Sequence, residues 1–153
     1  KKSRIYNFPQ ESQQDPENVL LSFIGGASAG RGNHYYEFIR GYVPVPANKA
    51  KGTCFVIEVD GNSMCKDDIH DGDLAVIKQE RDVEPGEIVL VRVNDELFLK
   101  RVRIEGSVAV LSSSNPDYSD IRFPAADVQI VGKFVYLIPG SIGKSLIQEG
   151  PVS

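Results

Sequence analysis

The strongest constraint on the fold is a series of short segments, rich in Val and Ile, that are separated by turn-forming residues. Such segments are typical of β-strands, because branched side chains pack well on a pleated surface. Asp71-Gly72-Asp73 and Asn115-Pro116-Asp117 mark turns, and Asn94-Asp95 separates two segments as in a tight hairpin. No long amphipathic helix or internal repeat interrupts the series, so the sequence predicts an all-β, barrel-like or folded sheet. The expected strands are residues 54–60, 74–78, 87–93, 96–103, 107–111 and 128–137.

The N-terminal region differs in composition from the strand-rich part of the chain. Pro9 and Pro16 lie among Gln, Glu, Ser and Asp, and a run of small residues follows from Gly25 to Gly32. Runs of this kind form no structure of their own and can be drawn into an extended form. The composition therefore predicts a flexible arm over residues 1–33, a main domain over residues 34–140 and a C-terminal tail over residues 141–153.

Charge and composition argue against several classes of protein. The net charge is −4 and no Lys/Arg cluster exceeds two residues, so this chain is not expected to bind DNA by itself. No apolar run approaches the roughly 20 residues that span a bilayer, and the polar first segment predicts no signal peptide. Two cysteines and two histidines without zinc-type spacing predict a cytoplasmic protein with no metal and no cofactor. Because the chain starts with Lys1 rather than Met, we expect a further segment to precede it.

Lys100 stands out within the expected strand 96–103. Side chains alternate across a strand, so Lys100 shares one face with Phe98, Val102 and Ile104 and is the only charged residue there. Burial on an apolar face opposes the charged form and lowers the pKa of a lysine, and a neutral amine can act as a general base. The alternative is an ordinary lysine whose amine reaches water at the edge of the strand.

Ser63 follows the apolar strand 54–60, in the turn Gly61-Asn62-Ser63-Met64. A serine in this position is held firmly and remains accessible, although it needs an adjacent base to act as a nucleophile. The backbone N–H groups of Asn62 and Ser63 could stabilise an oxyanion. The alternative is an ordinary turn serine.

Three residues could serve Ser63 as the base. His34 lies near the arm, and His70 lies in a polar loop, close enough in sequence to remain an alternative. Lys100 is favoured, because Ser-Lys dyads are a recognised variant of the catalytic triad. The acidic residues around His70 do not have the spacing of a calcium loop, so we expect a solvated turn there.

Several stretches, taken together and in order, resemble the LexA-type family of self-cleaving serine proteases. They include Ala29-Gly30, Val-Asp-Gly-Asn-Ser-Met at residues 59–64 and Glu-Leu-Phe-Leu-Lys-Arg-Val at residues 96–102, and further matches at 69–74, 111–118 and 131–135. The resemblance implies a LexA/signal-peptidase-like folded sheet or partly open barrel. It also implies a Ser-Lys endopeptidase in which Ser63 is the nucleophile and Lys100 the general base. The substrate would be the chain's own Ala29–Gly30 bond.

The resemblance also implies partners and a biological role. It predicts a homodimer, for which strand 128–137 could offer a pairing edge, and a RecA filament on single-stranded DNA that promotes cleavage. One function is the C-terminal domain of a LexA-like or phage-type transcription repressor, whose cleavage relieves repression in the SOS response to DNA damage. Such a repressor would contact DNA only through an N-terminal domain outside this chain. The alternative is a UmuD-like accessory subunit of a translesion polymerase. A signal-peptidase-like enzyme is more distant, because no membrane anchor is visible, and a structural relative that does not cleave itself is a further alternative.

Overall fold

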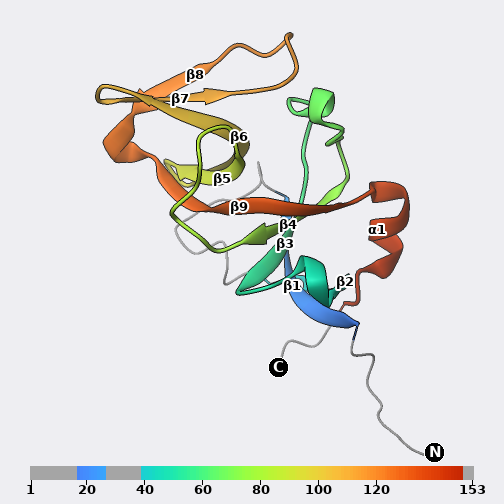
Figure 1. Ribbon diagram of the computed structural model, residues 1–153. Helices are drawn as coiled ribbons and strands as arrows, with labels where there is room; N and C mark the ends of the chain where they lie inside the picture. Colours follow the sequence, from blue (N-terminus) through green and yellow to red (C-terminus); the bar gives the residue numbers. More distant parts are fainter. Residues whose placement is uncertain (1–16, 27–38, 150–153) are drawn as a thin grey trace, which may run out of the picture.

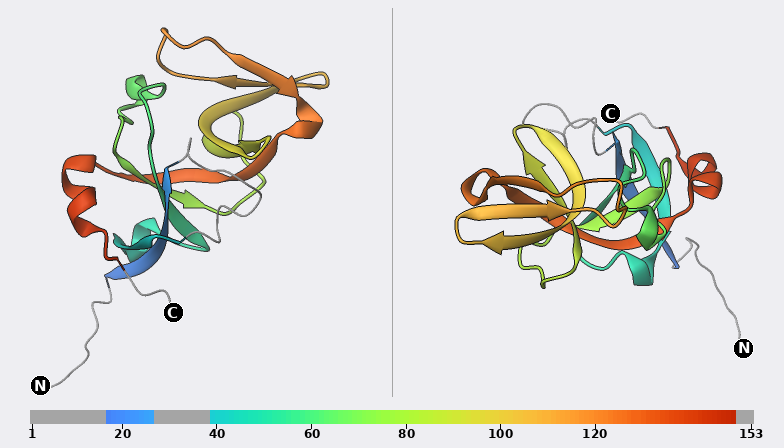
Figure 2. Two further views of the ribbon diagram at one scale, coloured as in Figure 1. Left: turned by 180° about the vertical axis from the view of Figure 1, so that it is seen from behind. Right: turned by 90° about the horizontal axis from the view of Figure 1, so that it is seen from above.

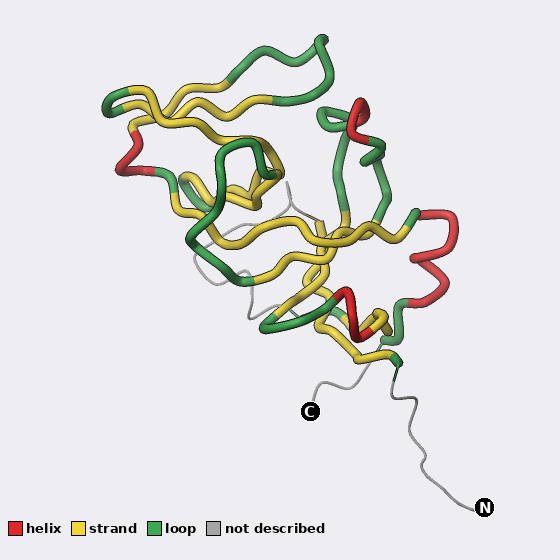
Figure 3. The backbone as a smooth tube through the Cα atoms, viewed as in Figure 1, coloured by secondary structure: helices red, strands yellow, loops and turns green. Residues whose placement is uncertain are grey.

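The computed structural model describes residues 17–26 and 39–149, which form one open sheet of nine strands (Figures 1 and 3). The strand order is β2-β1-β3-β4-β9-β5-β6-β7-β8. All neighbouring strands are antiparallel except β1 and β3, which run parallel. The strands are β1 (Asn18–Gly26), β2 (Gly41–Pro46), β3 (Cys54–Glu58), β4 (Leu74–Lys78), β5 (Ile88–Val93), β6 (Glu96–Glu105), β7 (Val108–Ser112), β8 (Ile121–Pro124) and β9 (Gln129–Ile138), and a short helix, α1 (Gly140–Leu146), follows.

Strand β9 joins the two halves of the sheet, β1–β4 on one side and β5–β8 on the other (Figures 1 and 2). It pairs with β4 from Lys133 to Ile138 and with β5 from Gln129 to Lys133. Each half of β9 is therefore paired along one side only within the described sheet. Both pairings contain a register shift, and such irregularities increase the local twist and bend a sheet.

Three clusters of buried side chains form the core. One packs around β1–β4 and α1, a second packs around β5–β8, and the third lies between them. The third cluster combines Ile57, Met64 and Ile69 from the β3–β4 region with Leu97 and Leu99 from β6. This central cluster brings the two sequence segments that contain Ser63 and Lys100 to the same part of the molecule.

The predictions of an all-β fold and of six strands are confirmed, with ends that shift by one to two residues. The hairpin between β5 and β6 is also confirmed. Asn94 and Asp95 have φ angles of 50° and 69°, the left-handed values that a two-residue type I′ turn requires. Alternation along β6 holds as well, because Leu97 and Leu99 join the central cluster while Phe98 and Val102 pack with the β5–β8 cluster.

The predicted flexible arm over residues 1–33 is wrong for Asn18–Gly26, which form strand β1. The cause is apolar burial: Leu21, Phe23 and Ile24 are all buried, and β1 pairs with both β2 and β3. Strands β2 and β8 were not predicted, and the expected tail contains α1. The bond Ala29–Gly30 and the side chain of His34 lie outside the described residues. Within the described part of the chain, no helix is long and apolar enough to cross a membrane.

Candidate active site in the cavity between Ser63 and Lys100

Ser63 lies in the loop that connects β3 to β4. Met64 and Ile69 are almost fully buried in the central cluster, so they anchor this loop on both sides of its short 3-10 turn. The two ends of the loop are joined by hydrogen bonds from the Val59 amide to the Asp73 carbonyl and from the Gly72 amide to the Val59 carbonyl, both 2.8 Å. The loop is thus a closed and anchored unit, and Ser63 is half-buried on it.

The turn that precedes Ser63 is held by side chains. Gly61 has a φ of +90°, and its amide donates to Asp71 Oδ1 at 2.7 Å. The Asp71 amide in turn donates to Asn62 Oδ1 at 3.0 Å. The amides of Asn62 and Ser63 themselves donate to no other group in the described part of the chain. Two neighbouring N–H groups are therefore available at the nucleophile candidate.

Lys100 lies in β6 opposite Val89 of β5, and only 6% of its surface is exposed. Desolvation by burial lowers the pKa of the Lys100 ammonium below its ordinary value. Its Nζ donates a hydrogen bond to Ser113 Oγ at 2.8 Å and lies 5.6 Å from the ring centroid of Tyr118. The predicted burial of this lysine is confirmed, and the alternative of a lysine whose side chain reaches into water is wrong.

Ser63 and Lys100 meet in one small cavity of about 60 Å³. The two residues come from different elements, Ser63 from the β3–β4 loop and Lys100 from β6. Within the described residues, Ser63 Oγ forms no hydrogen bond with Lys100 Nζ, which is engaged with Ser113. The cavity lining is mostly apolar and consists of Val59, Asp60, Ser63, Met64, Leu97, Phe98, Leu99 and Lys100.

The segment after β7, for which the sequence predicted a turn but no part in the site, contacts both Lys100 and the loop that contains Ser63. While Ser113 accepts from Lys100, the Asn115 amide donates to the Ser63 carbonyl at 2.9 Å and Asn115 Nδ2 donates to the Asn62 carbonyl at 3.1 Å. Ser114 Oγ accepts from the Lys66 amide at 3.1 Å. Three consecutive residues thus hold the candidate base and the candidate nucleophile loop in one arrangement.

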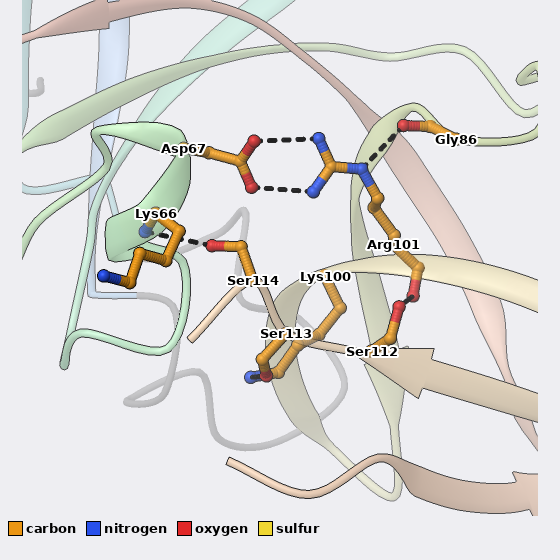
Figure 4. A network of polar contacts seen from close by, with 8 residues as sticks. All are labelled: Lys66, Asp67, Gly86, Lys100, Arg101, Ser112, Ser113 and Ser114. Carbon is orange, nitrogen blue, oxygen red and sulfur yellow. Dashed lines mark hydrogen bonds and ion pairs between the residues drawn. The ribbon is translucent and has the colours of Figure 1, made fainter. Parts of the chain in front are cut away.

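An ion pair makes a second connection between β6 and the β3–β4 loop (Figure 4). Arg101, the residue after Lys100, donates from its two terminal nitrogens to the two carboxylate oxygens of Asp67, at 2.7 and 2.9 Å. Its Nε donates to the Gly86 carbonyl at 2.8 Å. The hydrogen bonds from Arg101 hold the pKa of the Asp67 carboxyl below its usual value. Such two-pronged contacts fix orientation as well as distance.

His70, the alternative base, is not among the residues that line the cavity. Its side chain is 55% exposed and its Nε2 lies 3.9 Å from Asp68 Oδ1. The prediction of a solvated turn is wrong for Asp73, which is buried and accepts hydrogen bonds from the amides of His70 and Gly140. Among the described residues, no three His, Cys, Asp or Glu side chains converge as a metal-binding group.

Comparison with known proteins identifies the family of this chain. Residues 22–135 match the Peptidase S24-like family. The chain is 34% identical over 119 residues to a LexA repressor of Oleidesulfovibrio alaskensis, covering 76% of this chain and 58% of that protein. It is 43% identical over 107 residues to the LexA repressor of Methylococcus capsulatus, covering 69% of this chain and 52% of that protein. It is 30% identical over 145 residues to the LexA repressor of Thermosipho africanus, covering 90% of this chain and 73% of that protein. The chain thus spans a little over half the length of the first two relatives. The matched region contains every residue of the cavity, and the chain belongs to the Peptidase S24-like family, the LexA-type self-cleaving serine proteases.

Proposed function

We propose that this chain cleaves its own Ala29–Gly30 bond, with Ser63 as nucleophile and Lys100 as general base. The observation that carries the proposal is a buried lysine with a lowered pKa in the same small cavity as a serine. A serine hydroxyl is a weak nucleophile near neutral pH, and a neutral amine beside it supplies the missing base. Burial supplies the neutral amine, since desolvation disfavours the ammonium form.

The proposed reaction consists of acylation of Ser63, in which the peptide bond breaks, followed by deacylation by water. The hydroxyl proton of Ser63 passes to Lys100 Nζ as Oγ bonds to the carbonyl carbon of Ala29. The amides of Asn62 and Ser63 donate to the oxyanion that forms, and this role is supported because neither amide has another acceptor among the described residues. Lys100 then gives the proton to the Gly30 nitrogen as the C–N bond breaks. Water then bonds to the acyl carbon while neutral Lys100 accepts a proton from it. The bond between this carbon and Ser63 Oγ breaks, Lys100 returns the proton to Oγ, and Ala29 leaves as the new C-terminal carboxyl group; this scheme uses no metal or cofactor.

The proposed biological role is that of the C-terminal part of a LexA-like or phage-type transcription repressor, acting in the cytoplasm. The relatives named above are LexA repressors, which favours this role over that of a UmuD-like polymerase accessory protein. DNA would be bound by an N-terminal domain outside this chain, consistent with a net charge of −4 here. Cleavage promoted by a RecA filament on single-stranded DNA would separate that domain from the present one and relieve repression in the SOS response.

A homodimer is part of the same proposal. The second half of β9 is paired with β4 along one side, and its side chains Phe134, Val135, Tyr136 and Leu137 pack against the core clusters while remaining half-buried. The other side of this half is a free edge within the described sheet, and free edges pair readily with another chain. Two linked DNA-binding domains bind two half-sites of DNA more tightly than a single domain binds one half-site, so cleavage would weaken DNA binding.

The test is to incubate the chain at alkaline pH and weigh the products by mass spectrometry. We expect two fragments, residues 1–29 and 30–153, in the parent chain and in His70→Ala. We expect an intact chain in Ser63→Ala, Lys100→Ala and Lys100→Arg, because the guanidinium of arginine stays protonated. Cleavage that persists in Ser63→Ala, or that is lost in His70→Ala and kept in Lys100→Ala, would remove the proposed dyad.

A further inference from the structure

Ser113 is the one side chain in the described structure whose hydroxyl accepts a hydrogen bond from Lys100, and the proposed dyad does not include it. Ser113 is half-buried and directly follows β7, the strand that neighbours β6. The pairing of Arg101 with Ser112 places Ser113 opposite Lys100 in the register of the hairpin. The last pair of the β6–β7 ladder thus brings Ser113, the next residue, close to Lys100.

A lysine side chain has several rotatable bonds, so burial alone does not point its amine at a target. A neutral amine has two N–H groups and one lone pair, and a base is useful only if the lone pair faces the proton it accepts. When one N–H donates to Ser113 Oγ at 2.8 Å, the remaining directions of Nζ are restricted. Phe98 and Leu99, the two residues before Lys100, bring only apolar side chains to the cavity, and Ser63 is the one hydroxyl-bearing residue among those that line it.

We propose that Ser113 is the positioning residue for Lys100: it holds one N–H of the amine so that the lone pair faces Ser63. This inference rests on the proposed Ser-Lys function. The neighbouring serines make different contacts, since Ser112 Oγ donates weakly to the Arg101 carbonyl at 3.5 Å and Ser114 Oγ accepts from the Lys66 amide. Of the three serines Ser112, Ser113 and Ser114, only Ser113 is thus hydrogen-bonded to Lys100 in the described structure, so a neighbouring serine can serve as a matched control.

The hydrogen bond also has a consequence for the titration of Lys100. A hydroxyl acceptor stabilises an ammonium more than a neutral amine, so the Ser113 contact opposes the desolvation that lowers the pKa. The other titratable groups around the amine are Asp60 on the cavity wall and Tyr118, whose ring lies 5.6 Å away, with Lys66 and the Asp67–Arg101 pair in the adjoining loop. None of these changes in a Ser113 variant, so a shift on substitution reports on the hydroxyl.

The first measurement is the titration of the Lys100 13Cε resonance by NMR, in Ser63→Ala protein so that the chain stays whole. We expect Ser113→Ala to move the midpoint to lower pH, whereas Ser113→Thr restores the hydroxyl and keeps the parent midpoint. Ser112→Ala is the matched control and should leave the midpoint in place. An unmoved midpoint in Ser113→Ala would overturn the assignment, and it would do so whether or not the parent chain cleaves itself.

The second measurement is self-cleavage with Ser63 present, at a pH above every midpoint. Lys100 is then neutral in all variants, so only its position differs. We expect Ser113→Ala to cleave about 10- to 100-fold more slowly than the parent, a typical effect of misplacing a reacting group. Ser113→Thr and Ser112→Ala should cleave at nearly the parent rate. A parent-like rate in Ser113→Ala would contradict positioning, whereas cleavage that survives Lys100→Ala would remove the dyad and leave the Ser113–Lys100 contact intact.

Discussion

Gly132 of β9 lies directly against the backbone carbonyl of Lys78, at the end of β4. A β-carbon at residue 132 would overlap that carbonyl oxygen and would also come within 2.8 Å of Ile77 Cγ2. Gly132 pairs with Leu90 of β5 on its other side, so it marks the point where β9 passes from one half of the sheet to the other. The absence of a side chain is what lets the two halves share one strand.

Gly132→Ala is therefore expected to destabilise the fold, because neither a backbone carbonyl nor a paired strand can move aside cheaply. Overpacking in a close-packed region costs about 1–3 kcal/mol, and urea unfolding would measure it. Gly106→Ala is the comparison: Gly106 has a φ of +63° but has nothing within 4 Å of its would-be β-carbon. Its substitution strains the backbone without a clash, so an equal or larger loss there would contradict the close-contact explanation.

Asp67→Asn tests the connection between the β3–β4 loop and β6. The pKa of Asp67 is lowered in the folded chain, so its ion pair with Arg101 adds stability above the ordinary carboxyl pKa. That contribution is lost as the pH falls through the lowered value. We expect Asp67→Asn to cost about 1 kcal/mol near neutral pH, allowing for partial exposure of both side chains. The difference from the parent chain should vanish in acid. A difference that stays constant with pH would show that the carboxylate charge is not responsible.

Phe23→Ala tests whether β1 contributes to the stability of the fold. Phe23 is 6% exposed and packs in the cluster around β1–β4, and removal of a buried phenyl ring costs about 3–5 kcal/mol. Leu20, three residues earlier in the same strand, is 58% exposed, so Leu20→Ala should change stability by about 0.5 kcal/mol or less. Equal effects of the two substitutions in urea unfolding would mean that β1 does not pack as described.

Part of the site could be predicted from residue patterns because those patterns are local. Alternation along residues 96–103 placed Lys100 on an apolar face, and the observed burial agrees. Similar reasoning could have identified Ser113. If residues are counted outward along both strands from a hairpin turn at Gly106-Ser107, Lys100 and Ser113 fall at opposite positions. That step needs the register of two strands, which is fixed by the turn, and alternation within a single strand does not contain it.

The prediction failed where neighbouring residues in the chain gave the wrong context. The apolar residues of β1 lie between a polar segment and a run of small residues, and composition averaged over 1–33 concealed them. The stability of β1 comes from its pairing with β2 and β3, which are distant in sequence. Parallel strands such as β1 and β3 are not joined by a short turn, so no local turn signal in the sequence predicts their pairing. The hydrogen bond from Asn115 to Asn62 and the ion pair between Asp67 and Arg101 also depend on how separate segments of the chain fold together.

Lys100→Met gives a prediction about stability that does not depend on cleavage. Burial lowers the pKa of Lys100 in the folded chain, whereas the unfolded chain has a pKa of about 10.4. Between these two values the unfolded state binds more protons, so the parent chain gains stability as the pH rises. At pH values below the folded-state pKa the full penalty of burying the ammonium is present. Methionine fills a similar volume without a charge and avoids this penalty.

We therefore expect Lys100→Met to be more stable than the parent at neutral pH, and its advantage to shrink as the pH approaches about 10.4. Urea unfolding across this range would measure the trend, with Ser63→Ala in both proteins to prevent cleavage. Lys133→Met is the control of opposite sign, because the Glu87 carboxylate raises the pKa of Lys133. Lys133→Met should therefore be less stable than the parent at neutral pH, and this difference in stability should disappear as the pH rises through the raised pKa of Lys133. A Lys100→Met advantage that is absent at neutral pH, or that grows with pH, would mean that burial of the ammonium is not costly and would remove the physical basis for Lys100 as the base.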